Sequence, residues 1–295
     1  MFRTARLTAI AAALALTAAG AAAGTAVADG GHAQLPAGAK VLGAPKLLSV
    51  ERAAKLRTRI EAGRRAPRAP RLKVKRSRLE RAGAEHRAPI AGPAPEPGAR
   101  MFGNEAAYAA KRDHILGAIQ TFNAIMIPQL GGRYVPPALY ELPNGGLLPG
   151  CTSGVTNGAY CGNANTLGWS MAWTSNAFAQ SGDMKWATLI AHEYGHASQG
   201  FLGIRGGWMQ YTQYSEGYAD CMAGAFLWYA AYNRMLDNVG RGDYNEFRDA
   251  FVSLQSNVTN LNTHGTFDWR YALASYGWNT GFKGCATWAR SIDGV

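Results

Sequence analysis

The chain has 295 residues, of which 47% are hydrophobic, and a formal net charge of +11. A charge of this size can indicate a protein that binds polyanions such as nucleic acid. Its distribution excludes that class for most of the chain: residues 1–28 carry 2 basic residues, residues 29–100 carry 17 basic and 6 acidic residues, and residues 101–295 carry 11 basic and 13 acidic residues. The last and longest segment is therefore nearly neutral.

The first 28 residues are typical of an export signal. Arg3 and Arg6 give a positive start, an apolar run spans 7–24, and the Ala-Val-Ala at 26–28 offers a small-residue cleavage site. We expect a protein that is secreted or associated with the cell envelope. No later apolar stretch approaches the length of a bilayer-spanning helix, so no transmembrane anchor is expected.

Residues 29–100 are predicted to form a disordered basic arm or a propeptide. They contain no Phe, Trp, Tyr or Cys and include the run RRAPRAPRLKVKRSR, so they cannot bury enough apolar surface to offset chain entropy. A solvated linker, a propeptide and an arm that binds anionic cell-envelope polymers are the open alternatives. Specific nucleic-acid binding is not expected, because no aromatic residue is interleaved with the charge to stack on bases.

All 8 Trp, 13 Tyr and 4 Cys lie beyond residue 100, which predicts one folded domain over residues 101–295. Its first element is an amphipathic helix in EAAYAAKRDHILGAIQTF, where His114 is expected to line a surface or groove rather than bind a metal. The segment 162–180, GNANTLGWSMAWTSNAFAQ, alternates apolar and small polar residues and predicts one or two strands. Such a strand could border a cleft and pair with an extended peptide, or it could be a covered sheet edge.

The cysteine count is even, which in an exported chain favours disulfides. Cys151 and Cys161 flank a turn-rich loop that a disulfide could close, and Cys221 and Cys285 would then pair with each other. Four cysteines allow three connectivities, so this pairing is a preference. A zinc site built from cysteines is the lesser alternative, because no CxxC pair is present.

The segment LIAHEYGHASQG carries the strongest chemical signal in the chain. Asp183 can cap a helix that runs to the glycines near 200–203, and His192 and His196 then lie one turn apart on one face. Both imidazoles can reach one Zn²⁺, while Glu193, rotated by about 100°, can accept a proton from a water molecule at the metal. Two histidines bonded only to the backbone are the structural alternative.

A third ligand is expected in QYSEGYADCMAGAF, which reads as a buried helix. Glu216 and Asp220 are its two carboxylates, and buried carboxylates are costly unless they are paired or bind a metal. A helix that returns antiparallel would bring Glu216 beside the histidines and place Asp220 to hold a ligand histidine by its second nitrogen. An inert ion pair is the alternative, for which only Lys185 and Arg205 are near in sequence.

With these motifs the sequence resembles the gluzincin metalloproteases, in which HExxH on one helix is followed by ExxxD on the next. It is more closely similar to the neutral zinc metallopeptidase family of bacteria, over about residues 100–290. The resemblance implies that one Zn²⁺ is bound by His192, His196 and Glu216, with Glu193 as the base. The segments that carry it are the region of Cys151 and Tyr160-Cys161, the motif 192–196, the stretch 216–224, His264-Gly265-Thr266, Arg270 and Cys285.

His264 has two interpretations. It could donate a hydrogen bond to the oxyanion of a tetrahedral intermediate, as a distal histidine does in related peptidases. It could equally belong to a helix-capping turn formed by the Asn-Thr-His-Gly at 262–265.

We therefore predict an α+β, zincin-like metallopeptidase domain behind a disordered basic arm. A small, mostly antiparallel sheet is expected to precede a helical half that carries HExxH. The expected function is a secreted zinc endopeptidase that acts on protein or peptide substrates with one Zn²⁺ per chain. A zinc-containing, non-proteolytic cell-surface binding module and a peptidoglycan-directed zinc amidase are the alternatives, and the intact Glu193 disfavours the binding module.

Overall fold

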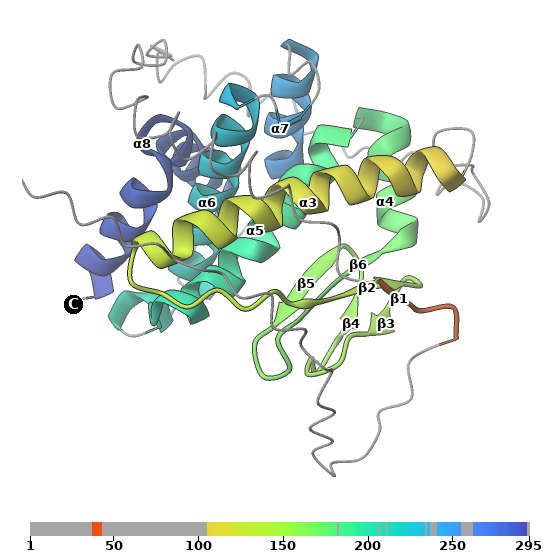
Figure 1. The fold of residues 1–295 in the computed structure, drawn as a ribbon, viewed down its shortest axis with the longest axis horizontal. Helices are drawn as coiled ribbons and strands as arrows, with labels where there is room; N and C mark the ends of the chain where they lie inside the picture. The colour runs from red at the N-terminus through yellow and green to blue at the C-terminus, as the bar shows by residue number, and fades with distance from the viewer. Residues whose placement is uncertain are drawn as a thin grey trace, which may run out of the picture. The chain divides into compact units, whose positions relative to one another are not determined.

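The computed structural model describes a mixed sheet with helices packed against it, as Figure 1 shows in colour. The export signal at 1–28 and most of the basic arm lie outside the described residues, so the domain boundaries stay predictions. The described ranges are 37–42, 105–181, 183–205, 207–210, 212–233, 235–236, 241–254 and 262–293.

The described strands form one four-stranded sheet, in the order β1-β2-β6-β5, and one small hairpin, β3-β4. β2 and β6 are parallel, while β1 with β2 and β5 with β6 are antiparallel. The sheet is therefore mixed, because the chain makes the β3-β4 hairpin and β5 before β6 returns beside β2. The strands are β1 (Lys40–Leu42), β2 (Ala138–Leu142), β3 (Gly146–Leu147), β4 (Gly154–Val155), β5 (Gly158–Cys161) and β6 (Thr166–Ser170).

β1 lies inside the segment predicted as a disordered arm. Its three residues pair antiparallel with β2, with Val41 opposite Tyr140, and Leu42 packs against the main hydrophobic core. The prediction of disorder is therefore wrong for residues 40–42. The short Lys-Val-Leu stretch contains no proline, so each of its residues can pair with the edge of β2.

The segment 162–180 contains one strand and nearly the whole of a helix rather than two strands. β6 is the predicted strand, and its five residues are all buried. The chain then enters α4 (Met171–Ser181), where the hydroxyl of Ser170 accepts a hydrogen bond from the amide of Trp173 at 3.3 Å. This N-cap ends the strand, and the alternation beyond Ser170 misled the prediction.

The described residues contain six α-helices, drawn in Figure 1 with the strands gathered beside them. α5 is the central one, and it packs against α3, α4, α6, α7 and β5. Among these helices none is long and apolar enough to cross a bilayer. The helices are α3 (Glu105–Gln129), α4 (Met171–Ser181), α5 (Asp183–Leu202), α6 (Thr212–Tyr232), α7 (Arg241–Leu254) and α8 (Phe267–Asp293), with a short 3₁₀ helix, η3 (Gly207–Gln210), between α5 and α6.

α5 begins at Asp183, as the sequence predicted, but another residue caps it. The carboxylate of Glu246 on α7 accepts a hydrogen bond from the amide of Met184 at 2.9 Å, while Asp183 pairs with Lys111 of α3 at 2.5 Å. These contacts fix the N-terminus of α5 against α3 and α7. The helix that carries the histidines is therefore held at its start by two neighbours.

The core joins the sheet to α5 through a contact between two aromatic side chains. Trp169 of β6 and Trp186 of α5 are fully buried, and their rings meet edge to face at 5.4 Å. Nearby, the buried carboxylate of Glu141 on β2 accepts hydrogen bonds from Tyr108 at 2.8 Å and Arg112 at 2.9 Å, both on α3. Sheet, α3 and α5 therefore form one packed unit, which keeps β5 in place beside the histidine face of α5.

Candidate metal centre and active site

α5 presents His192 and His196 on one face, as their spacing predicted. The two rings lie 4.8 Å apart at 88° to each other. His192 is buried, whereas the side chain of His196 is 18% exposed. One imidazole is therefore enclosed by protein, and the other lies at the edge of a cavity.

α6 runs antiparallel to α5 and brings its carboxylates to the histidines. The order of the contacts shows the direction, because His192 meets Asp220 while Gln199 meets Ser215. Gly195 allows the close approach: a Cβ there would lie only 2.6 Å from Cα of Ala219. The glycine within HEYGH therefore serves the packing of α6 onto α5.

Glu216 lies between the two histidines. Its Oε2 is 3.2 Å from Nε2 of His192, and its Oε1 is 3.3 Å from Nε2 of His196. One atom from each of the three residues falls within 4.8 Å of the others, a spacing that suits ligands of a single metal ion. The buried group of two histidines and a glutamate could therefore hold a metal.

Asp220, one turn after Glu216, holds His192 from the other side. Its Oδ1 lies 2.8 Å from Nδ1 of the imidazole, and the carboxylate is completely buried. An acceptor at Nδ1 fixes the tautomer with the proton on that nitrogen and leaves a lone pair on Nε2. This is the position that the sequence predicted for Asp220.

Arg270 of α8 completes the group, and the sequence had given it no role beyond the resemblance. The guanidinium is 1% exposed and donates from Nε and Nη2 to the two oxygens of Asp220, each at 2.8 Å. Nη2 also lies 3.4 Å from Oε2 of Glu216, and Nη1 donates to the backbone oxygen of Leu254. Buried Asp220 therefore has its counter-charge 50 residues further along the chain.

The donor set fits a cation between Glu216 and the histidines. With Nδ1–H given to Asp220, Nε2 of neutral His192 is an acceptor that faces a carboxylate oxygen at 3.2 Å. Two acceptors at that distance repel unless a proton or a metal ion lies between them. Nε2 of His196 faces the other oxygen in the same way, so one ion could satisfy all three residues.

The electrostatics of the metal-free group agree with this need for a cation. Burial lowers the pKa of His192, but the charge and hydrogen bond of Asp220, with those of Glu216, outweigh it and raise the pKa to about 10. Burial raises the pKa of Glu216, but His196 and His192 outweigh that effect and hold it well below its usual range. Without a metal, a proton therefore takes the place between His192 and Glu216.

Glu193 lies beside the group without belonging to it. It is 6% exposed and lines a cavity of about 760 Å³ together with His192, His196 and Glu216. Burial raises the pKa of Glu193, and the neighbouring histidines His192 and His196 oppose that rise. A carboxylate with a raised pKa on a cavity wall is suited to accept and release a proton.

The edge strand β5 forms another part of the cavity wall. Residues 157–160 line the cavity, and Gly158 packs against α5, where a Cβ would lie 3.2 Å from Cγ of Glu193. Within the described sheets β5 pairs only with β6. The sequence left open whether the strand in residues 162–180 borders a cleft or is a covered sheet edge. Gly162 and Asn163 line the cavity, but strand β6 of this segment lies inside the sheet between β2 and β5, so the edge position belongs to β5.

His264 reaches the cavity, whereas His114 does not. Nε2 of His264 lies 3.7 Å from Oε1 of Glu216, and its side chain is 58% exposed. The start of α8 is capped by Thr266, whose hydroxyl accepts from the amide of Trp269 at 3.4 Å, so the cap does not use the imidazole. His114 lies on α3, partly buried and away from the cavity residues.

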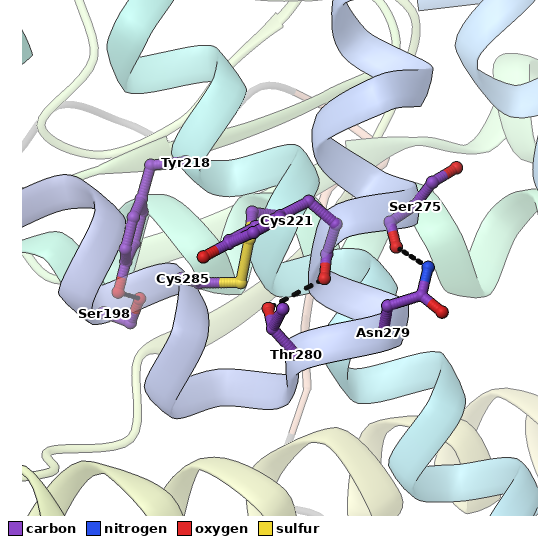
Figure 2. The surroundings of a disulfide bond; sticks show 8 residues. Ser198, Tyr218, Cys221, Ser275, Asn279, Thr280 and Cys285 are labelled. Atoms are coloured by element: carbon purple, nitrogen blue, oxygen red, sulfur yellow. Dashed lines mark hydrogen bonds between the residues drawn. A yellow bond between two sulfur atoms is a disulfide. The ribbon is translucent and has the colours of Figure 1, made fainter. Parts of the chain in front are cut away.

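Both cysteine pairs that the sequence favoured are present as disulfides, Cys151–Cys161 and Cys221–Cys285. The second pair, shown in Figure 2, links α6 to α8 directly after Asp220. Glycines let the helices touch there: a Cβ at Gly224 would overlap the carbonyl oxygen of Ala274. α8 is interrupted at Gly281 (φ 69°), between Arg270 and Cys285, so the glycine contact holds the segment with Arg270 to α6 and the disulfide holds the segment after the break. Two disulfides suggest an oxidising, extracellular environment.

Comparisons of the chain with protein-family models, curated proteins and solved structures find no match. The case for a function therefore rests on the chemistry of this site.

Proposed function

We propose that the protein is a secreted zinc-dependent peptidase of the gluzincin type, similar to the neutral zinc metallopeptidases of bacteria. The observation that carries this proposal is the convergence of His192, His196 and Glu216 within 4.8 Å, with Glu193 beside them on a cavity wall. A structural zinc site normally has four protein ligands, whereas this group offers three among the described residues. The arrangement therefore supports catalysis at the metal.

Zinc is the metal that this donor set suits best. Two imidazoles and one carboxylate are a recurring ligand set of catalytic zinc, which keeps a further position open for water or substrate. We expect one Zn²⁺ per chain. Bound there, the ion would polarise the peptide carbonyl and make a water molecule acidic enough to lose a proton near neutral pH.

Glu193 is the proposed general base. Its carboxylate takes the proton of the attacking water and then passes it to the nitrogen of the leaving amine. Its burial, which raises the pKa of the carboxylate, brings that pKa closer to the pH at which the enzyme works. The same residue therefore serves as base in the first proton transfer and as acid in the second.

His264 is proposed to assist by donating a hydrogen bond. Its imidazole lies on the cavity wall, 3.7 Å from Glu216, and its partial exposure lets it turn toward a substrate. A donor at that place can stabilise the negative oxygen that develops on the attacked carbonyl.

An extended peptide is the substrate shape that the cavity favours. β5 has one strand partner within the described sheets, and residues 157–160 line the cavity beside Glu193. An edge strand can pair its backbone with an added strand, which gives affinity without requiring a particular side chain. We propose that the substrate chain lies along β5 with a peptide bond over the metal.

The basic arm would hold the enzyme near anionic polymers of the cell envelope.

The test is hydrolysis by the purified mature protein of casein and of purified cell walls, each with and without a chelator. Casein cleavage that stops with chelator and returns with added zinc supports the proposal. Release of peptides from cell walls alone would favour the amidase. One bound zinc per chain without turnover of either substrate would favour a binding module.

A further inference from the structure

Arg205 lies on the wall of the cavity. Its guanidinium is next to Gly200, which lies one helical turn beyond His196. Gly200 follows His196 by four residues, which is about 6 Å along the helix and close to the same face. A Cβ at Gly200 would lie 2.5 Å from Nη2 of Arg205, so the guanidinium rests against this glycine. Both Gly200 and Arg205 line the cavity.

The end of α5 holds Arg205 in this position. Gly203 has a φ of 69°, its amide donates to the oxygen of Gly200 at 3.3 Å, and the amide of Ile204 donates to the oxygen of Gln199 at 2.9 Å. These two bonds form the glycine-terminated cap that reverses the chain at a helix C-terminus. Ile204 is 2% exposed in the main core, so the backbone that leads into Arg205 is anchored.

The charge of Arg205 has no acidic partner in the described part of the chain. The other arginine on the cavity wall, Arg270, is neutralised by the two oxygens of Asp220. Arg205 is exposed, and its charge reaches Tyr160 of β5: burial raises the pKa of this phenol, and the charge of Arg205 opposes the rise. The guanidinium therefore lies between the end of α5 and the edge strand, with its charge directed at the cavity.

We propose that Arg205 is a specificity residue that binds a carboxylate of the substrate. The inference rests on the proposed peptidase function and deepens it by naming the substrate class. A guanidinium presents a fork of N–H donors that matches a carboxylate, and no carboxylate of the described residues occupies this fork of Arg205. The carboxylate is either the side chain of an Asp or Glu near the cleaved bond or the C-terminus of a short peptide.

The charges on the rest of the wall strengthen this preference. At the other end of the wall, the charges of Glu193 and Glu216 would be offset by the proposed Zn²⁺, so that end adds no net positive charge to compete for a carboxylate. Arg205, which follows the C-terminus of α5 and rests against Gly200, attracts it. A substrate with one carboxylate should therefore bind in a single alignment, with that carboxylate at Arg205.

The kinetic test uses peptides that differ only by Glu or Gln at one position, each with a free or amidated C-terminus. The wild-type protein should cleave the best Glu peptide, or the best free-acid peptide, roughly tenfold faster in kcat/KM than its neutral partner. Arg205→Gln should remove this ratio while zinc content stays unchanged, and Arg205→Glu should invert it. Arg133→Gln changes the net charge equally at an exposed site outside the cavity and should keep the ratio.

A binding test separates this inference from the peptidase proposal. Glu193→Gln protein, whose turnover should be slower by roughly 10² or more, is titrated with the same peptides by calorimetry, with and without Arg205→Gln. Weaker binding of the carboxylate peptides alone after loss of Arg205 supports the inference, even if no peptide is hydrolysed and the peptidase proposal fails. Hydrolysis, or binding, that is as selective in Arg205→Gln as in wild type would overturn the inference while leaving the peptidase proposal in place. Equal binding of the charged and neutral peptides by the parent protein would overturn it as well.

Discussion

Arg270 clamps Asp220 through two hydrogen bonds of 2.8 Å, one to each carboxylate oxygen. One of those oxygens also accepts from Nδ1 of His192. The orientation of a candidate metal ligand on α5 therefore depends on α6 and α8, which the Cys221–Cys285 disulfide joins. A substitution at any residue in this series of contacts should change the affinity for the metal.

Asp220→Asn should weaken zinc affinity by roughly 10- to 100-fold. The amide oxygen can still accept from His192, but the negative charge that makes the imidazole a better donor to zinc is lost. Competition with a chromophoric chelator measures the change. Unaltered affinity would show that Asp220 only packs the core.

Arg270→Gln should destabilise the metal-free protein by about 3–5 kcal/mol, because it leaves a fully buried carboxylate without its counter-charge. Urea unfolding of the metal-free protein gives the value. Arg248→Gln is the matched control: Arg248 pairs with Asp249 at 3.1 Å on the surface, and loss of such a pair should cost less than about 1 kcal/mol. Equal losses of stability in the two variants would contradict the role of buried Arg270 as the counter-charge of Asp220.

Replacing His192, His196 or Glu216 by Ala should abolish stoichiometric zinc binding.

The raised pKa of His192, about 10 without metal, means that near neutral pH a proton occupies Nε2 and must leave when zinc binds. Zinc affinity should therefore fall as the pH is lowered, by roughly tenfold per pH unit below that pKa. Calorimetry in two buffers of different ionisation enthalpy counts the protons, and binding without proton release would contradict this protonation state.

The two disulfides should differ in their contributions to stability and in their effects on zinc affinity. Cys221–Cys285 closes a separation of 64 residues and Cys151–Cys161 one of 10. In the chain-entropy model these loops correspond to about 4 and about 3 kcal/mol of stability. Replacing the first pair by serines should also reduce zinc affinity, because α8 carries Arg270, whereas replacing the second should leave zinc affinity unchanged. Chelator competition on the two double variants decides between these outcomes.

Local signals in the sequence predicted much of the candidate site. The spacing of His192, Glu193 and His196 follows from helix geometry alone, and Glu216 and Asp220 were found because carboxylates in an apolar helix need partners. Arg270 could not be found in that way, because its contact with Asp220 spans 50 residues and depends on how α8 crosses α6. Its presence in the family resemblance was the one available signal.

The fold was predicted less completely than the site. Periodicity identified α3, α5 and β6, and apolar composition identified α6. The strand pattern was extended past Ser170, however, where a single hydroxyl begins α4. Tertiary packing decides which strands pair with each other. Local sequence patterns therefore could not predict the parallel pairing of β2 with β6 or the edge position of β5. β1 was missed because its three residues lie in a segment whose composition indicates disorder.

The most direct test of the proposed function is the rate of peptide hydrolysis and the zinc content of Glu193→Gln, measured on the same preparation. Glutamine keeps the size of the side chain but cannot accept the proton of the attacking water. We expect one zinc per chain, a melting temperature near that of the wild type and a fall in kcat by roughly 10² or more. Full peptidase activity in Glu193→Gln with zinc bound would contradict the proposed role of Glu193.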